Sequence, residues 1–390
     1  MGVLDEIDWE KILRPEEFIF KEKSREVKIE RIKDAYKRLF NSRPNLDKNK
    51  IVNADFLFVK SMKRHDYDWL FNEIFTTCEG CNKEIVDIKY INSGRKRVYP
   101  LTIFFRYLFL YRKAIRLNFL DTIYLIFKMS DYLEAYDKTK HYNYKKLIVF
   151  ADMQPIDNML VQIAKKKNIP TVTMQHGLYV DYKNYSTVNA TNYSSAVADI
   201  FLAWGNDTAE LINKYHPNII TKVVGKPFEF KKIQKKENYF TVVFDQNIFH
   251  KNNKEILEIA YMISKDFGLN INLRLHPNNK VDWYRIDEKV ILFNQELKNS
   301  HFVIGHTTSI LYELMRLGIP VYKFKSDIPS NKLDEEFKFS TLKELEDKIK
   351  HHKKENFDFS NYAKIYIEYI DDESLDKYKE FFKRLKNGKI

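Results

Sequence analysis

Residues 301–324, HFVIGHTTSILYELMRLGIPVYKF, decide the fold class. An apolar run, HFVIG, precedes a polar segment and then a helix-like stretch, SILYELMRL, which ends at Gly318, a residue type suited to stopping a helix. The next run, IPVYKF, is short and rich in branched and aromatic residues, as buried strands are. Strand, helix and strand in this order predict a parallel α/β unit.

The alternation of strand and helix continues on the N-terminal side of this unit. Short apolar runs closed by turn residues predict further strands in KKLIVFAD (145–152), IPTVTMQHG (169–177), ITKVVGKP (220–227), YFTVVFDQ (239–246), INLRLHP (271–277) and VILFN (290–294). Helical patterns lie between them, at 155–168, 206–215 and 254–267. We therefore predict the α/β class, with two Rossmann-like open sheets in two domains that face one cleft.

Length and linker composition set the expected domain boundaries. A chain of 390 residues exceeds what one hydrophobic core usually spans. A lysine-rich linker over residues 227–238 separates the two predicted sheets. We expect an N-terminal domain over 1–228, a C-terminal domain over 229–360, and helices over 361–390 that cross back to pack on the N-terminal domain.

Overall composition excludes several classes of protein. With 44% hydrophobic residues, 10 glycines and 10 prolines, the chain is neither disordered nor collagen-like. The acidic first residues are unlike a secretion signal, and two cysteines suit a reducing cytoplasm, so a cytoplasmic location is expected. Cys78 and Cys81 have the spacing of half a zinc site, but no second pair completes it, and we interpret them as packing residues.

The net charge indicates an anionic partner but does not determine which kind. The net charge of +12 attracts nucleic acid, anionic lipid or phosphorylated substrates. An apolar segment over residues 101–120 is interrupted by Arg106, Arg112, Lys113 and Arg116, which argues against a membrane span. A buried helix and an amphipathic surface for an anionic membrane or a lipid-linked acceptor both remain open for this segment.

Polar residues at the ends of the C-terminal strands predict a phosphate site. Ligands of open parallel sheets bind beyond the carboxyl ends of the strands. Thr307, Thr308 and Ser309 follow one strand and open a helix, where hydroxyls and free amides suit a phosphate, although a simple helix cap is the alternative. Glu313 lies one turn further on the same helix face, where it can accept hydrogen bonds from ribose hydroxyls or merely face solvent.

Two neighbouring strand ends add to this candidate site. Arg274 and His276 alternate onto the same face of their strand, before a proline that fixes the backbone, and both can donate to phosphate oxygens. Protonated His276 can also assist a departing nucleotide. Gln246 follows the first strand of the C-terminal sheet, where a binding loop and a plain polar turn are equally compatible with the sequence.

The N-terminal half offers candidates for a general base. His176 is placed between Gln175 and Gly177 after a strand, and we expect the glycine to allow a tight turn that exposes the imidazole toward the cleft. Asp152 and Asp181 are the other candidates, and His176 is preferred because its pKa suits proton transfer near neutral pH.

The series TMQHG, LAWGND, VVGKP, FDQ, RLHP and HTTSILYELMRLGIPV resembles bacterial GT-B glycosyltransferases of capsular and surface-polysaccharide biosynthesis, over roughly residues 145–324. In sialyltransferases and teichoic-acid glycerophosphotransferases the histidine-proline pair and the hydroxyl-rich helix start are implicated in holding nucleotide phosphates. The resemblance therefore implies donor binding by His276, Thr308 and Ser309. The paired-acid-plus-glycine motif that supplies the base in those sialyltransferases is not found in the N-terminal half.

The resemblance implies a metal-independent transfer from a nucleotide-sugar donor, bound by the C-terminal domain, to a glycan or lipid-linked glycan, bound by the N-terminal domain. Inversion at the anomeric carbon is our own expectation. No cofactor is expected, and the enzyme would act in the cytoplasm or peripherally on the inner face of the membrane. A CDP-glycerol or CDP-ribitol phosphotransferase is the nearest alternative, because it shares the nucleotide half. A non-catalytic basic binding protein is a more distant one, and nothing resembles a nucleic-acid recognition element.

Overall fold

The computed structural model describes residues 7–17, 29, 32–33, 36–37, 42–46, 51–62, 65–92, 119–181, 188–228, 236–245, 249–276, 279–287, 290–293, 295–326 and 333–390. The chain forms two compact units. Unit 1 comprises Met1–Trp204, Thr208–Val224 and Asp372–Ile390, and unit 2 comprises Gly205–Asp207 and Gly225–Asp371. The expectations for Gln246, for residues 101–118 and for most of the linker lysines lie outside the described residues.

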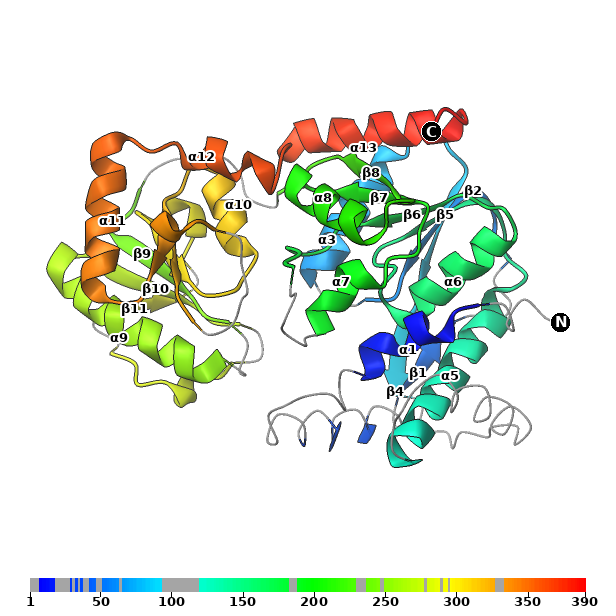
Figure 1. The fold of residues 1–390 in the computed structure, drawn as a ribbon, viewed down its shortest axis with the longest axis horizontal. Helices are drawn as coiled ribbons and strands as arrows, with labels where there is room; N and C mark the ends of the chain where they lie inside the picture. Colours follow the sequence, from blue (N-terminus) through cyan, green and yellow to red (C-terminus); the bar gives the residue numbers. More distant parts are fainter. Residues whose placement is uncertain are drawn as a thin grey trace. The chain divides into compact units, whose positions relative to one another are not determined.

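Unit 1 is built on a six-stranded parallel sheet with the strand order β3-β2-β5-β6-β7-β8 (Figure 1). Its strands are β2 (Asn53–Lys60), β3 (Lys83–Asp87), β5 (Asn143–Val149), β6 (Thr171–Met174), β7 (Ile200–Ala203) and β8 (Ile220–Val223). A separate antiparallel pair joins β1 (Ser42–Asn45) to β4 (Lys89–Asn92). The central strands are buried on both faces, which explains their nearly continuous apolar sequences.

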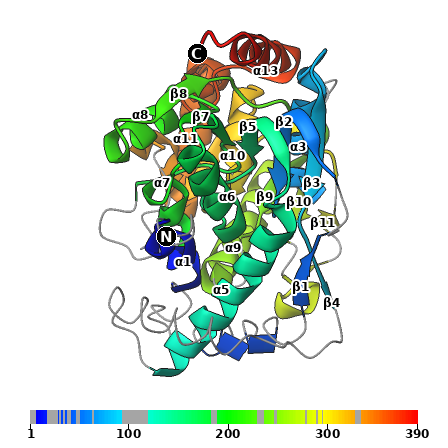
Figure 2. The same ribbon diagram turned by 90° about the vertical axis from the view of Figure 1, so that its right-hand side faces the viewer.

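Helices cover both faces of this sheet. Along β2, Leu57 and Val59 belong to a core cluster that includes side chains from α1 (Trp9–Glu17), α5 (Phe119–Thr139) and α6 (Pro155–Lys166), and these three helices contact one another (Figure 2). Phe56 and Phe58 point to the opposite face, as alternation along a strand requires. There Phe58 packs on Phe71 of α3 (His65–Thr77). Two further helices are α7 (Thr191–Ser194) and α8 (Asn206–Tyr215).

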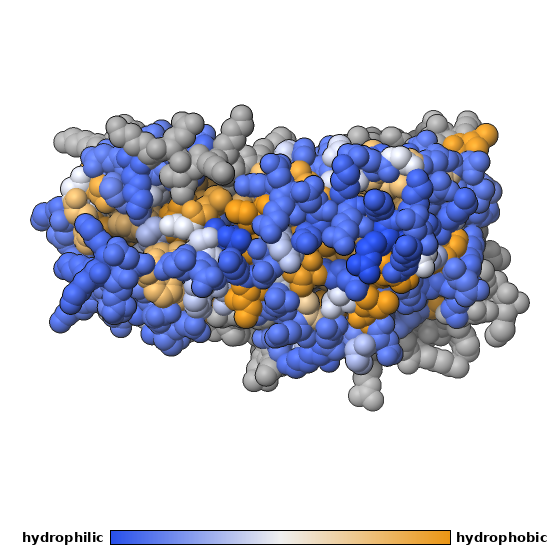
Figure 3. Space-filling view, turned by 90° about the horizontal axis from the view of Figure 1, so that it is seen from above, coloured by the Kyte–Doolittle hydropathy of each residue, from blue (hydrophilic) through white to orange (hydrophobic). Residues whose placement is uncertain are grey.

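The last helix, α13 (Asp371–Lys386), completes unit 1. Its Phe382 ring lies 6.2 Å from the ring of Phe56 and 5.6 Å from that of Phe58. The Ser374 hydroxyl donates to the carbonyl of Val224 at 2.9 Å. Its buried residues recur at helical spacing, and the face that carries α13 is largely hydrophilic on its outer side (Figure 3). The helix therefore acts as an amphipathic cover for one face of the sheet.

Unit 2 contains a second six-stranded parallel sheet, in the order β11-β10-β9-β12-β13-β14. Its strands are β9 (Tyr239–Val243), β10 (Asn270–Arg274), β11 (Ile291–Phe293), β12 (Val303–Gly305), β13 (Val321–Phe324) and β14 (Lys338–Phe339). Two contacting helices, α9 (His250–Phe267) and α11 (Leu342–Glu355), pack together, and α10 (Ile310–Arg316) packs with α12 (Phe359–Tyr362) (Figure 1). The predicted α/β class with parallel sheets is confirmed.

Local signals account for several helix ends. Helix α6 begins at Pro155, whose fixed φ suits a first turn. Helix α9 ends at Phe267 and is capped by Gly268, which adopts a left-handed conformation with φ of +64°. Helix α9 starts earlier than expected, at His250 rather than Lys254. Within the described part of the chain, no helix is both long enough and apolar enough to cross a bilayer.

We expect Phe382→Ala to lower the free energy of unfolding by about 3–5 kcal/mol, because it leaves a cavity among the aromatic rings beneath α13. Chemical denaturation followed by circular dichroism measures this loss. Lys383→Ala, at the adjacent exposed position, serves as the control and should change stability by less than about 0.5 kcal/mol. Equal losses in the two variants would show that α13 does not support the sheet.

Candidate functional site

The strand order of unit 2 creates a topological switch point. The chain runs from β9 to β10 and β11 on one side, and then crosses to β12 on the other side of β9. Ligands of open parallel sheets bind at such a point, beyond the carboxyl ends of the strands. The residues that follow β9, β10 and β12 here are Asp245, His276 and the segment 306–309. The predicted phosphate-site residues therefore come from adjacent strand ends.

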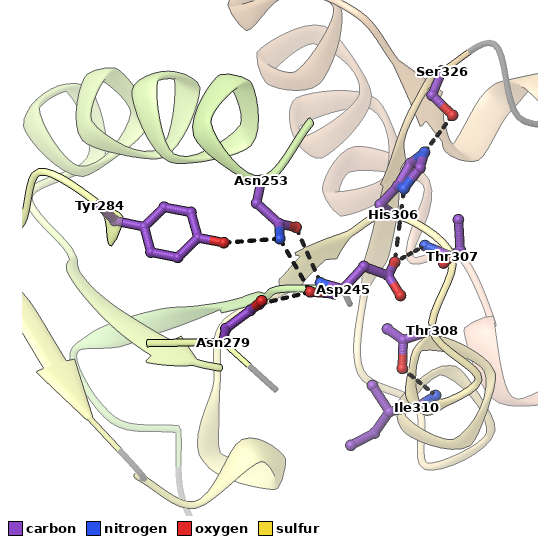
Figure 4. Close-up of polar contacts among 9 residues, drawn as sticks. All are labelled: Asp245, Asn253, Asn279, Tyr284, His306, Thr307, Thr308, Ile310 and Ser326. Carbon is purple, nitrogen blue, oxygen red and sulfur yellow. Dashed lines mark hydrogen bonds and ion pairs between the residues drawn. The ribbon is translucent and has the colours of Figure 1, made fainter. Parts of the chain in front are cut away.

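Asp245 ties these strand ends together (Figure 4). Its side chain, on a residue that is 5% exposed, accepts a short hydrogen bond from the Thr307 amide through Oδ2. The Asp245 carbonyl accepts from the Asn279 side chain at 2.7 Å. The side chain of the fully buried Asn253 accepts from the Asp245 amide at 3.0 Å and donates to the Asp245 carbonyl at 3.1 Å. The loops after β9, β10 and β12 are thus fixed through one residue.

His306 is the buried residue of the β12 loop. Its ring packs against Phe249, and its Nε2 is hydrogen-bonded to Ser326 Oγ, which follows β13 (Figure 4). Burial, aided by the nearby charge of Lys323, lowers the pKa of His306 to about 3. The imidazole is therefore neutral near pH 7, and its Nδ1 atom, 3.7 Å from Asp245 Oδ2, does not form an ion pair. His306 shapes the loop rather than supplying charge.

Lys323 places a second unusual group near this edge. It lies on β13, is 4% exposed, and pairs in register with Gly305 of β12. Burial, together with the charge of Lys338, lowers its pKa to about 7. A buried amine that titrates near neutrality can gain a proton when a negatively charged ligand arrives.

The hydroxyl-rich segment leaves backbone amides available at the start of α10. Ser309 is the N-cap residue, yet its side chain makes no capping hydrogen bond, and Thr308 Oγ1 accepts only a long bond of 3.4 Å from the Ile310 amide. The helix-cap interpretation therefore explains little of this segment. Thr307, Thr308 and Ser309 are all partly exposed, as ligand-binding groups need to be.

The remaining predicted donor-site residues differ in exposure. Arg274, the last residue of β10, is exposed, and His276 just beyond it is half-buried. Glu313 does not face solvent: it is 8% exposed and forms an ion pair of 2.6 Å with Lys226. Of the two interpretations of Glu313 that the sequence left open, the plain solvated glutamate is wrong.

His176 lies in unit 1 among aromatic rings and is not exposed as expected. It is 5% exposed, because the rings of Tyr67, Phe150 and Tyr179 surround the imidazole. Its Nδ1 lies 3.0 Å from the Tyr179 hydroxyl. Gly177 does not have a positive φ and has open space where a Cβ would stand, so the turn does not require a glycine. The order of residues along the chain gave no sign of this aromatic enclosure.

The two aspartates proposed as bases have different surroundings. Asp152 is fully enclosed, and its Oδ2 accepts hydrogen bonds from the amides of Val197 and Ala198 at 2.7 and 3.0 Å. Burial raises its pKa in spite of these bonds. Asp181 instead accepts from Lys214 at 2.6 Å and from the Tyr215 hydroxyl at 2.7 Å. Both carboxylates are engaged with groups of unit 1.

Gln175 connects two strand ends rather than facing a ligand. The residue is fully buried. Its Oε1 accepts from the Trp204 amide at 2.7 Å, and its Nε2 donates to the Gly177 carbonyl at 2.9 Å. Its role as an acceptor-binding residue stays a prediction, and these bonds favour a structural one.

Sequence reasoning missed several residues of the unit 2 site. Asp245 lies in the loop for which a binding loop and a polar turn were equally compatible with the sequence, and nothing in the sequence indicated that it connects three loops. Lys323 has a visible signal, a charge inside the apolar run IPVYKF, whereas nothing in the sequence pairs Lys226 with Glu313. Among the described residues, no three histidine, cysteine, aspartate or glutamate side chains gather as metal ligands.

Comparison with known proteins resolves the fold. No family model matches the chain, and no curated protein matches it by sequence. The UDP-N-acetylglucosamine 2-epimerase of Rickettsia bellii is similar over 84% of this chain and 98% of its own, with a TM-score of 0.50 and 11% identity. A putative UDP-N-acetylglucosamine 2-epimerase of Listeria monocytogenes is similar over 86% and 96%, with a TM-score of 0.51 and 10% identity. The chain has a GT-B-like fold. At such identities the likeness concerns the fold alone.

Asp157 yields a prediction about pH and stability. It lies in the first turn of α6, is fully buried, and accepts from the Ala151 amide at 3.3 Å. Burial raises its pKa from 3.8 to about 8. In the unfolded chain this carboxyl loses its proton once the pH exceeds its ordinary pKa of 3.8, whereas in the folded protein it stays protonated up to about pH 8. The folded state is therefore destabilised as the pH rises from about 4 to about 8.

We therefore expect Asp157→Asn to raise the melting temperature at pH 8 and to change it little at pH 4, because the amide cannot ionise. Thermal unfolding at a series of pH values tests this. Asp137→Asn, at a side chain that is 67% exposed, is the matched control and should show no such trend. A gain of the same size at both pH values would refute the assignment of a raised pKa to Asp157.

Proposed function

We propose that this protein is a glycosyltransferase that moves a sugar from a nucleotide-activated donor to a glycan or lipid-linked glycan in the synthesis of bacterial surface polysaccharide. The observation that carries the proposal is the convergence of three polar loops on Asp245 at the switch point of unit 2. The GT-B-like fold supports the nucleotide-sugar part of the proposal, since the two similar structures are named as a UDP-N-acetylglucosamine 2-epimerase and a putative one.

The donor phosphates are assigned to the β12 and β10 loops. The hydroxyls of Thr307, Thr308 and Ser309, with the amides of Thr308 and Ser309, would bind phosphate oxygens, and Arg274 and His276 would supply positive charge. These groups act on the charge that develops on the departing nucleotide, which is the main electrostatic task of such a transfer. Glu313 would accept hydrogen bonds from the ribose hydroxyls.

His176 is our proposed general base, ahead of Asp152 and Asp181. Oδ2 of Asp152 accepts hydrogen bonds from two backbone amides of unit 1. The carboxylate of Asp181 forms an ion pair with Lys214. His176 is the one of the three that is bonded through Nδ1 to a neutral hydroxyl, which can orient its ring for proton transfer through Nε2. The tyrosine would then act as an orienting group.

Ligand binding tests the donor site. We expect one member of the set CMP, CDP, UDP and GDP, or its sugar conjugate, to raise the melting temperature of the wild-type protein, because a ligand at about a hundred times its Kd stabilises the native state by about 2.7 kcal/mol. His276→Ala and Thr308→Ala should abolish the shift. His351→Ala, at a 56% exposed histidine of α11, should retain it. No shift with any nucleotide would contradict the proposal.

Turnover separates the transferase from other uses of the same fold. Incubation with UDP-N-acetylglucosamine in the absence of an acceptor should leave the sugar unchanged, as judged by nuclear magnetic resonance. Inversion at the sugar C2 would instead indicate an epimerase. Stabilisation by CDP-glycerol and not by nucleotide sugars would indicate a polyol phosphotransferase, which transfers an alcohol phosphate.

A further inference from the structure

Lys226 has no role in the proposed function so far, yet its side chain contacts Glu313, which we assigned to the donor site of unit 2. It follows β8 in the segment VVGKP, and its Nζ lies 2.6 Å from Oε1 of Glu313 on α10. The side chains of Lys226 and Glu313 are 14% and 11% exposed. An ion pair this enclosed is weakly screened by solvent, so each partner strongly constrains the other.

The backbone around Lys226 is fixed independently of its side chain. Gly225 has a φ of +75°, and a Cβ there would stand 2.1 Å from the carbonyl oxygen of Tyr369, so only glycine fits. The Lys226 amide donates to the same carbonyl at 2.9 Å, and Lys226 forms a parallel bridge with Ile370. The lysine therefore projects from a rigid point of the chain, which is what a residue that orients another side chain requires.

The contacts of Glu313 divide its carboxylate into two halves. Oε1 receives the Lys226 ammonium and lies 3.5 Å from the Ser309 hydroxyl. No described residue donates to Oε2. A carboxylate with one oxygen anchored and the other open is an acceptor with a fixed direction. It suits a ligand hydroxyl, and it disfavours a ligand phosphate, which carries the same sign of charge.

We propose that Lys226 is a positioning residue that holds Glu313 as a directed acceptor for the ribose 2′-hydroxyl, so that the site selects ribonucleotides over 2′-deoxyribonucleotides. This inference rests on the proposed nucleotide site. It differs from a role of Lys226 as counter-ion to the phosphates, because a counter-ion would strengthen the binding of both kinds of nucleotide equally. The ratio of the two affinities is therefore the decisive quantity.

The experiment is calorimetric titration of the full chain with UDP and 2′-deoxy-UDP, with the corresponding CDP and GDP pairs alongside. For the wild-type protein we expect the ribonucleotide to bind about ten- to a hundredfold more tightly, the effect of one hydrogen bond to a charged acceptor. In Lys226→Met the ratio should fall to less than about threefold, because Glu313 loses the partner that directs it. Lys226→Arg, which retains the ion pair, should restore most of the discrimination.

Two further variants control the interpretation. Lys251→Met removes the same charge from a side chain of unit 2 that is 90% exposed, and it should leave the ratio unchanged. Glu313→Gln should lower the ratio with Lys226 in place. If Lys226→Met does not fold, as judged by circular dichroism, Lys226→Gln serves for the same measurement.

The outcomes distinguish a failure of nucleotide binding from a failure of the positioning role of Lys226. If the wild-type protein binds none of the six nucleotides, the proposed function fails and the inference falls with it. If the wild-type protein binds both members of a pair equally, or if Lys226→Met weakens both equally and keeps the ratio, the nucleotide site stands and the positioning role of Lys226 is overturned.

Discussion

The hydrogen bond from the Thr307 amide to the Asp245 carboxylate is the constraint on which the unit 2 site depends. Parallel strands bring their carboxyl ends to one edge of a sheet, but they do not determine how the loops beyond that edge are arranged. Asp245 determines it here, because its side chain binds the β12 loop and its main chain binds Asn279 and Asn253. The fully buried Asn253 also donates a hydrogen bond to the hydroxyl of Tyr284, so this hydrogen-bond network extends from the loops into the core.

Unit 1 uses a related device at its own sheet edge. Asp152 follows β5 and receives the amides of Val197 and Ala198, while Gln175 follows β6 and receives the amide of Trp204. In both units a buried polar side chain after one strand satisfies backbone donors that belong to a neighbouring connection, which buried amides require. The difference lies in what remains accessible. Thr307, Thr308 and Ser309 of unit 2 are partly exposed, whereas aromatic rings enclose His176 of unit 1.

Features set by short stretches of chain were predictable from the sequence. Helix α8 spans the expected Asn206–Tyr215, and Pro155 and Gly268 mark helix ends as expected. Their physical causes are a fixed φ, a permissive φ and a local hydrophobic period. The position of Thr307, Thr308 and Ser309 between a strand and a helix was predictable for the same reason, since strand ends can be read from the chain. The burial of His176 and the pairing of Glu313 with Lys226 were not, because their partners come from distant segments.

The position of α13 has a consequence for how the protein is made. Unit 2 is nearly continuous in sequence, from Gly225 to Asp371, whereas unit 1 needs residues from both sides of it. During synthesis, the face of β2 that carries Phe56 and Phe58 has no cover from Phe382 until the residues after 371 leave the ribosome. The core beneath α13 can therefore be completed only after unit 2 has been synthesised, and incompletely covered apolar surface of this kind is what makes nascent chains prone to aggregation.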